Sequence, residues 1–239
     1  QPDYIPEWTQ PTQPEEPEEG ETPAASGPNV MDIDFDALIA NETDSTLKDM
    51  HEYFRDRTPT EKNQYTGMFQ GKNLLLFTGE AFWIGAVNEQ YTPTLYKLAH
   101  SGFVFENFYN PLWYYSTVDG EYAATTGLIP TNQVNASQRY AGKNGVSMYF
   151  SMGNQLRALG YPTLAYHNNT ANYYDRNLSH PNLGYDFYAC DTGLDVAMTW
   201  PQSDLEMMQA SVDDYIGSET PFHAYYMTFS GHYQYNWDN

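Results

Sequence analysis

The first regular pattern of apolar positions along the chain spans residues 44–57, where they recur at helical intervals. Asp44 or Ser45 stands at the start of this pattern and can cap the N-terminus of a helix. The apolar positions that share one face are Leu47, Met50 and Phe54. The spacing predicts an amphipathic helix, which we expect to lie against the main body of the protein.

The pattern changes at residue 73, where a continuous apolar run begins. Such a run is typical of a strand that is buried on both faces of a parallel sheet. Beyond it, strand-like segments alternate with segments of helical spacing. The predicted strands are 73–78, 103–109, 162–167 and 221–232, and the predicted helices are 92–102, 146–159, 203–216 and a short one that begins near Thr117.

This alternation predicts a doubly wound α/β fold, with a mostly parallel sheet that carries helices on both faces. Helix boundary signals agree with it. Pro93 stands at a first helical position, Ser203 can cap a helix, and Gly160 and Gly217 follow the last helical residues. Ligands of such sheets bind beyond the carboxyl ends of the strands, so functional side chains are expected there.

The chain is strongly acidic, with a formal net charge of −21 over 239 residues. Such a surface repels phosphate backbones, so we expect no nucleic-acid partner. An anionic substrate would need a local cation, which a metal ion can supply. The single cysteine, Cys190, excludes an internal disulfide framework and a multi-thiolate zinc site.

The composition predicts three regions. Residues 1–28 are rich in Pro, Glu and Thr, with few aliphatic side chains, and are expected to form an acidic linker. Residues 29–72 are expected to form an N-terminal helical segment, and 73–239 the main body. The chain has no apolar stretch of about 18 residues. Because it begins at Gln1 without a methionine, we expect an upstream segment that carries a membrane anchor.

Two candidate metal ligands follow predicted strands. Glu80 comes two residues after the run 73–78, where a carboxylate suits a hard divalent cation, although a surface or capping role also fits. Thr117 follows the strand predicted at 103–109, and metal coordination is one way to make a threonine hydroxyl nucleophilic. Spacing alone does not separate this role from helix capping by Ser116 or Thr117.

Two further candidates follow the later strands. Arg176 lies in a polar and aromatic segment after the strand 162–167, and its planar guanidinium suits a pair of phosphate or sulfate oxygens. A surface salt bridge to Asp175 or Asp186 is the alternative. His232 follows the last strand, either as a hydrogen-bond donor to substrate or as a structural residue. All four candidates fall on one edge of the predicted sheet.

Five motifs carry a resemblance to a known family. They are NLLLFTGEAFW (73–83), TPTLYKLAHSGFVFENFYNP (92–111), STVDGEYAATTGLIPT (116–131), YYDRNLSHPNLGYDFY (173–188) and MTFSGHYQY (227–235). In order and spacing they resemble the extracellular catalytic domain of the lipoteichoic acid synthases, within the alkaline phosphatase and sulfatase superfamily. The resemblance spans residues 30–239.

The resemblance implies roles for individual residues. Glu80 and Thr117 would bind a manganese or magnesium ion, and Thr117 would also be the catalytic nucleophile. Tyr174, Arg176 and His232 would contact the substrate, with tyrosine at a position where the family often has tryptophan. No other cofactor is implied.

The family completes its metal site with an Asp-His pair downstream of the motif that contains His232, and this sequence has no Asp-His dipeptide. We therefore expect residues 73–239 to be the N-terminal part of a sulfatase-like catalytic domain. Its sheet and metal site would be incomplete at the C-terminus, with little metal affinity or activity in this chain alone.

The implied reaction moves glycerol phosphate from phosphatidylglycerol to a growing glycerol-phosphate polymer, at the extracellular face of the bacterial cell membrane. A sulfatase is disfavoured because the Cys/Ser-x-Pro-x-Arg motif is absent from the sequence. A phosphoethanolamine transferase also uses a metal-bound threonine, but it usually carries several cysteines. A non-catalytic cell-surface binding module on a degenerate synthase domain is the alternative from a different class.

Overall fold

The computed structural model describes residues 26–30, 33–105, 107–109, 116–130 and 137–232. The chain forms two compact units, residues 1–70 and 71–239, each with its own internal packing. Most of the predicted acidic linker, residues 1–25, lies outside the described residues.

The first unit contains a hairpin of two helices, α1 (Phe35–Asn41) and α2 (Ser45–Arg55). Asp44 caps α2, because its carboxylate accepts hydrogen bonds at 2.8 and 3.1 Å from two backbone N–H groups of the first turn. The helix predicted over 44–57 is confirmed, with Asp44 rather than Ser45 as its cap. The packing of this segment against the main body stays a prediction.

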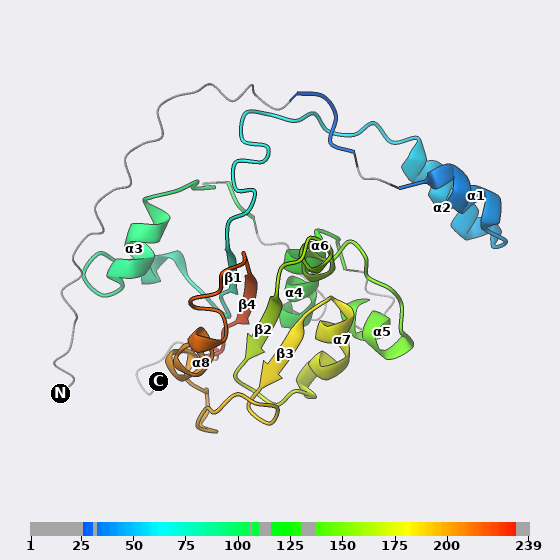
Figure 1. Ribbon diagram of the computed structural model, residues 1–239. Helices are drawn as coiled ribbons and strands as arrows, with labels where there is room; N and C mark the ends of the chain where they lie inside the picture. Colours follow the sequence, from blue (N-terminus) through cyan, green and yellow to red (C-terminus); the bar gives the residue numbers. More distant parts are fainter. Residues whose placement is uncertain (1–25, 31–32, 106, 110–115, 131–136, 233–239) are drawn as a thin grey trace. The chain divides into compact units, whose positions relative to one another are not determined.

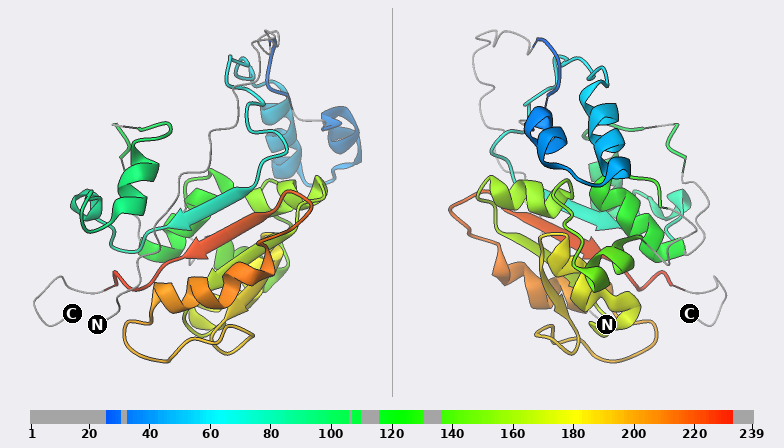
Figure 2. Two further views of the ribbon diagram at one scale, coloured as in Figure 1. Left: turned by 60° about the vertical axis from the view of Figure 1, so that its left-hand side comes forward. Right: turned by 90° about the vertical axis from the view of Figure 1, so that its right-hand side faces the viewer.

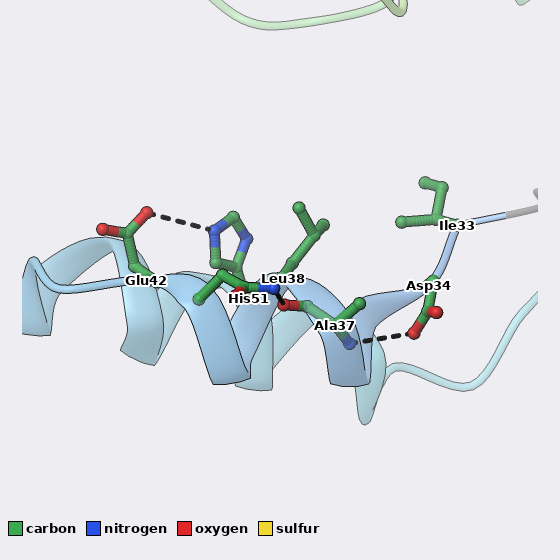
Figure 3. A pocket seen from close by; sticks show the side chains of 7 residues that line it. Ile33, Asp34, Ala37, Leu38, Glu42 and His51 are labelled. Atoms are coloured by element: carbon green, nitrogen blue, oxygen red, sulfur yellow. Dashed lines mark hydrogen bonds and ion pairs between the residues drawn. The ribbon is translucent and has the colours of Figure 1, made fainter.

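An open pocket lies beside these two helices (Figure 3). Glu42 and His51 face each other there, with His51 Nε2 3.6 Å from Glu42 Oε2. Ile33 and Leu38 contribute apolar side chains to the lining. The residues predicted for the functional site do not line this pocket, so it belongs to a different part of the molecule.

Among the described residues, the second unit is built on a parallel sheet with the strand order β1-β4-β2-β3 (Figure 1). Every residue of the two inner strands, β2 and β4, is buried, as expected for strands covered on both faces. The strands are β1 (Leu74–Thr78), β2 (Thr163–His167), β3 (Asp186–Ala189) and β4 (His223–Met227).

Helices alternate with these strands along the chain. Ser203 caps α8 as predicted, since its hydroxyl accepts a hydrogen bond from the backbone N–H of Glu206 at 3.2 Å. The helix predicted over 146–159 is shorter than expected, because Ser151 caps it and it begins at the next residue. The α-helices of this unit are α3 (Pro93–Ala99), α4 (Ser116–Thr126), α5 (Ser137–Asn144), α6 (Met152–Ala158), α7 (Arg176–Asn182) and α8 (Asp204–Ser211), and the 3-10 helices are η1 (Ile84–Ala86), η2 (Tyr173–Asp175) and η3 (Val212–Asp214).

The helices cover both faces of the sheet, with α8 on one face and α4, α6 and α7 on the other (Figure 2). Alternate side chains of the inner strands enter two separate cores. Tyr166 and Tyr226 pack with Met207 of α8, whereas Ala165 and Tyr225 pack in the second core. The predicted fold class, a doubly wound parallel sheet, is confirmed.

One predicted strand is wrong. The described residues of 103–109 form no strand, and Phe105 and Phe108 are 77% and 79% exposed. Aromatic and β-branched residues favour a strand only where a neighbouring strand can pair with them. The fourth strand of the sheet is instead β3, which the sequence pattern did not indicate.

No helix within the described ranges has the length and apolar character that crossing a membrane requires.

Candidate active site

The strand register brings the ends of three strands to one edge of the sheet. Thr78 of β1 and His167 of β2 both pair with Met227 of β4. The segments that carry Glu80 and His232 therefore leave the sheet at the same edge, the carboxyl edge, as predicted.

The backbone of Glu80 is held against the segment that follows β4. Thr228 Oγ1 accepts a hydrogen bond from the Glu80 N–H at 2.9 Å and donates one to the Thr78 carbonyl oxygen at 3.1 Å. Gly231 lies so close that a Cβ atom there would be 2.6 Å from the Glu80 carbonyl oxygen. Glycine at this position allows the segment before His232 to approach Glu80.

Glu80 and Thr117 meet side chain to side chain. Thr117 Oγ1 donates a hydrogen bond to Glu80 Oε2 at 2.9 Å, and both residues are half-buried. Thr117 arrives there as the second residue of α4, not at the end of a strand, because 103–109 forms none. The helix begins at Ser116, so Thr117 lies inside it and is not the N-cap residue.

The two side chains offer the oxygen ligands that Mn²⁺ or Mg²⁺ prefers. Neighbouring ligands of an octahedral ion with bonds of about 2.1 Å lie about 3 Å apart, and the two oxygens of Glu80 and Thr117 are 2.9 Å apart. Among the described residues, neither this edge nor any other part of the structure brings together three or more His, Cys, Asp or Glu side chains that could hold a metal ion. The pair therefore fits two positions of a hard-cation site.

Arg176 forms a buried ion pair that the sequence did not reveal. Its Nη2 lies 2.8 Å and its Nε 3.1 Å from Glu121 Oε2, and both side chains are 1% exposed. The expected alternative partners are engaged elsewhere, Asp175 with Arg139 and Asp186 with Arg157. A surface salt bridge for Arg176 is therefore wrong.

Glu121 is surrounded by hydrogen-bond donors. Besides Arg176, Tyr225 donates from its hydroxyl to Glu121 Oε1 at 3.2 Å, and His180 Nε2 lies 3.5 Å from the same oxygen. Burial alone would raise the pKa of the Glu121 carboxyl, but Arg176 and His180 together hold it below the usual range. Burial lowers the pKa of His180, so this histidine contributes a hydrogen bond rather than a second positive charge.

Tyr174 is influenced by both Arg176 and Glu80. The Arg176 guanidinium carbon is 5.4 Å from the centre of the Tyr174 ring. Burial raises the pKa of the Tyr174 hydroxyl, and the charge of Glu80 contributes to the same shift. Tyr174 and Asp175 both have left-handed backbone angles, with φ of 58° and 56°. Such a conformation is unfavourable for non-glycine residues and is found where a side chain must be aimed.

The segment that carries His232 is held by the first residue of α8. Asp204, the first residue of α8, accepts hydrogen bonds from the backbone N–H groups of Phe229 at 2.6 Å and Ser230 at 2.9 Å. The His232 ring packs 5.5 Å from the ring of Trp200 and 5.2 Å from that of Phe229. It therefore lies at the carboxyl edge as predicted, half-buried among aromatic side chains.

His167, the last residue of β2, is a further candidate site residue that the sequence analysis missed. Its Nδ1 donates to the Met227 carbonyl oxygen at 3.0 Å, and its buried Nε2 has no hydrogen-bond partner among the described residues. Burial, followed by the charge of Arg176, lowers the pKa of His167 to about 3. Its position at the end of a predicted strand was a signal that could have identified it, as it did Glu80 and His232.

Comparisons with known proteins identify the family of the chain. A model of the sulfatase family matches residues 72–238, so the chain belongs to the sulfatase family. The chain is 23% identical over 215 residues to lipoteichoic acid synthase 2 of Bacillus subtilis (strain 168), covering 84% of this chain and 32% of the relative. Lipoteichoic acid synthase 1 of the same organism is 24% identical over 188 residues, covering 73% and 29%.

The fold also matches a solved structure. The crystal structure of the lipoteichoic acid synthase LtaP from Listeria monocytogenes aligns with a TM-score of 0.59 and 24% identity, covering 70% of this chain and 42% of that chain. The chain spans about a third of the length of the curated relatives that it matches. The resemblance to lipoteichoic acid synthases that the motifs indicated is confirmed.

Proposed function

We propose that this chain is part of a metal-dependent phosphotransferase of the lipoteichoic acid synthase type. The enzyme would move glycerol phosphate from phosphatidylglycerol to a growing glycerol-phosphate polymer. The observation that supports this most directly is the contact between Thr117 Oγ1 and Glu80 Oε2, 2.9 Å apart at the carboxyl edge of the sheet.

Thr117 is the proposed nucleophile. Its Oγ1 loses its proton and forms a bond to the phosphorus of phosphatidylglycerol, the bond from phosphorus to the diacylglycerol oxygen breaks, and the leaving oxygen takes up a proton, so that no net proton is gained or lost. The product held on the enzyme is a glycerophosphoryl ester of Thr117. Attack by a terminal glycerol hydroxyl of the polymer then transfers the group and regenerates the threonine hydroxyl.

Glu80 orients the nucleophile. Its carboxylate accepts the hydrogen bond of Thr117, which points the remaining lone pairs of Oγ1 away from Glu80. Glu80 and Thr117 are also the residues that would hold Mn²⁺ or Mg²⁺. A bound ion of this kind favours the ionised hydroxyl and offsets phosphate charge.

The remaining site residues are proposed to hold the phosphodiester. Arg176 supplies N–H donors, and Tyr174 lies beside its guanidinium with its ring centre 5.4 Å away. His232 is a hydrogen-bond donor to substrate. His167 presents an unprotonated Nε2, because its Nδ1 carries the proton that Met227 accepts, so it can accept a hydrogen bond from a glycerol hydroxyl.

The same proposal assigns roles to the regions of the chain. Residues 1–28 are a linker toward a membrane anchor, 29–72 an N-terminal helical segment, and 73–239 the N-terminal part of the catalytic domain. The enzyme would act at the extracellular face of the bacterial membrane, where phosphatidylglycerol is available.

Replacing Thr117 with alanine in the full-length protein tests the proposal. Release of diacylglycerol from fluorescent phosphatidylglycerol in detergent micelles should fall by at least about 1,000-fold while the circular dichroism spectrum stays unchanged. Thr126→Ala is a matched control in the same helix, because its hydroxyl makes local backbone hydrogen bonds, donating to the Tyr122 carbonyl oxygen at 2.6 Å and accepting from the Leu128 N–H at 3.2 Å. Full activity of Thr117→Ala would reject Thr117 as the nucleophile.

A further inference from the structure

Glu121 is a buried carboxylate that the proposed reaction does not use. It lies four residues after Thr117 in α4, so the two side chains project from the same side of the helix, one turn apart. Its partner, Arg176, is the first residue of α7, 55 positions further along the chain. One helix therefore carries the proposed nucleophile and the anchor of the proposed phosphate-binding arginine.

Three of the N–H groups of the Arg176 guanidinium donate hydrogen bonds within the described part of the protein, and the others do not. Nε and Nη2 both donate to Glu121, and Nη1 donates to the Tyr173 carbonyl oxygen at 3.3 Å. A guanidinium has five N–H groups, so one on Nη1 and one on Nη2 remain after these bonds. Such a pair can form the parallel hydrogen bonds that a phosphate accepts from arginine.

We infer that Glu121 is the positioning residue of Arg176, fixing the guanidinium relative to Thr117 so that its two remaining N–H groups serve the phosphoryl oxygens of the substrate. This inference rests on the proposed function.

The surroundings of Glu121 support a fixed geometry. The Tyr225 hydroxyl and the His180 ring contact Glu121 Oε1, while Arg176 takes Oε2, so both carboxylate oxygens are engaged. The guanidinium is covered on another side by Tyr174, whose ring centre is 5.4 Å from Cζ. Because the Arg176 side chain is 1% exposed, the inference requires Tyr174 to move aside before a phosphate can reach the guanidinium, while Glu121 holds the guanidinium in place.

The pairing also determines how Arg176 acts. Glu121 balances the charge of Arg176, so the arginine contributes directed hydrogen bonds rather than a net positive charge. Removing the carboxylate alone leaves a buried, uncompensated cation, which is strongly destabilising, whereas removing both charges is tolerated far better. The two-residue variant is therefore the informative one.

A double-mutant cycle in the full-length protein tests this positioning role. The variants are Glu121→Gln, Arg176→Gln and the double variant, assayed for kcat and KM with fluorescent phosphatidylglycerol at saturating Mn²⁺. Each single variant should lower kcat/KM by about 10- to 100-fold, and the double variant should match Arg176→Gln within about 3-fold. Asp186→Asn, which breaks the exposed contact of Arg157 at 2.8 Å, is the control and should leave kcat/KM unchanged.

The outcomes separate positioning from a merely structural role. If Glu121 acts independently of Arg176, the two losses multiply in the double variant, and the inference is overturned. If Glu121→Gln does not fold, the double variant is compared with Arg176→Gln alone. Equal kcat/KM values support the inference, and a lower value in the double variant overturns it. Wild-type kcat/KM in a folded Glu121→Gln protein would also contradict it.

A binding measurement keeps the inference apart from the proposed reaction. If the wild-type protein does not turn over phosphatidylglycerol, the proposed function fails, and the same four proteins are titrated with inorganic phosphate by calorimetry. Equal weakening of phosphate affinity in Arg176→Gln and in the double variant still supports the inference. Undetectable phosphate binding by the wild-type protein overturns it.

Discussion

The hydroxyl of Thr117 donates a hydrogen bond to the carboxylate of Glu80 across 2.9 Å, although the two residues are 37 positions apart in the sequence. They reach each other from different kinds of element, the segment after β1 and the N-terminal turn of α4. The contact places the proposed nucleophile beside the proposed metal ligand, at the edge of a parallel sheet where ligands bind. The predictions below depend on this arrangement.

Replacing Glu80 with glutamine is expected to weaken metal binding while preserving the size of the side chain. The amide lacks the negative charge that a hard cation favours, so the affinity for Mn²⁺ should fall by more than about 100-fold. Calorimetric titration of the full-length protein with Mn²⁺ measures this. Glu89→Gln is the control, since Glu89 is exposed and should leave the affinity unchanged. Equal affinity in both variants would show that Glu80 is not a ligand.

Replacing Gly231 with alanine is expected to push the His232 segment away from Glu80. The added Cβ would lie 2.6 Å from the Glu80 carbonyl oxygen, so the backbone must shift. We expect the free energy of unfolding in urea to fall by about 1–3 kcal/mol. Gly102→Ala meets nothing within 4 Å and should change it by less than about 0.5 kcal/mol. An undisturbed Gly231→Ala protein would argue against the close approach.

Local signals made much of the fold predictable. The cap residues Asp44 and Ser203 act within the first turn of their own helices, and the continuous apolar run correctly predicts the strand β1. The prediction that this run is buried on both faces is wrong, because β1 lies at the edge of the described sheet, with Leu75 and Phe77 45% and 48% exposed. The described residues of 103–109 are strand-like in type but pair with no described strand, and β3 has only four residues, of which the first, Asp186, is charged and exposed. Whether each of these two segments forms a strand depends on pairing with a segment far away in the sequence, and the periodicity of a sequence does not predict such pairing.

Those candidate site residues that follow a strand of the sheet were predictable, because ligands of parallel sheets bind beyond the carboxyl ends of the strands. Glu80 and His232 follow predicted strands, although the strand predicted over 221–232 forms only over His223–Met227. The same reasoning applied to β2 would have included His167. The partner of Arg176 was not predictable, because Glu121 is 55 residues away and looks like an ordinary acidic residue in the first turns of a helix. Only the fold brings the two charges together.

The buried histidines are expected to make stability depend on pH. Burial, and then the charge of Arg176, lower the pKa of His167 to about 3, and burial also lowers the pKa of His180 and His223. A histidine in the unfolded chain has a pKa of about 6.5. The unfolded state therefore binds more protons below that pH, so stability is full above about pH 6.5 and decreases as the pH falls.

Urea denaturation of the full-length protein at a series of pH values checks this dependence. In His167→Asn, the amide can still donate to the Met227 carbonyl oxygen, but one titrating group is lost. The decrease in the free energy of unfolding between about pH 6.5 and 5 should then be smaller by up to about 1.4 kcal/mol per pH unit. An unchanged slope would mean that His167 becomes protonated in the folded protein over this range.

The central claim, that Thr117 is the nucleophile, is tested most directly by trapping the covalent intermediate. The full-length protein is mixed with Mn²⁺ and phosphatidylglycerol in the absence of polymer acceptor, quenched in acid, digested and analysed by mass spectrometry. The account predicts a glycerophosphoryl group on Thr117 in the wild-type protein and none in Thr117→Ala. Release of diacylglycerol with the group on another residue would contradict it.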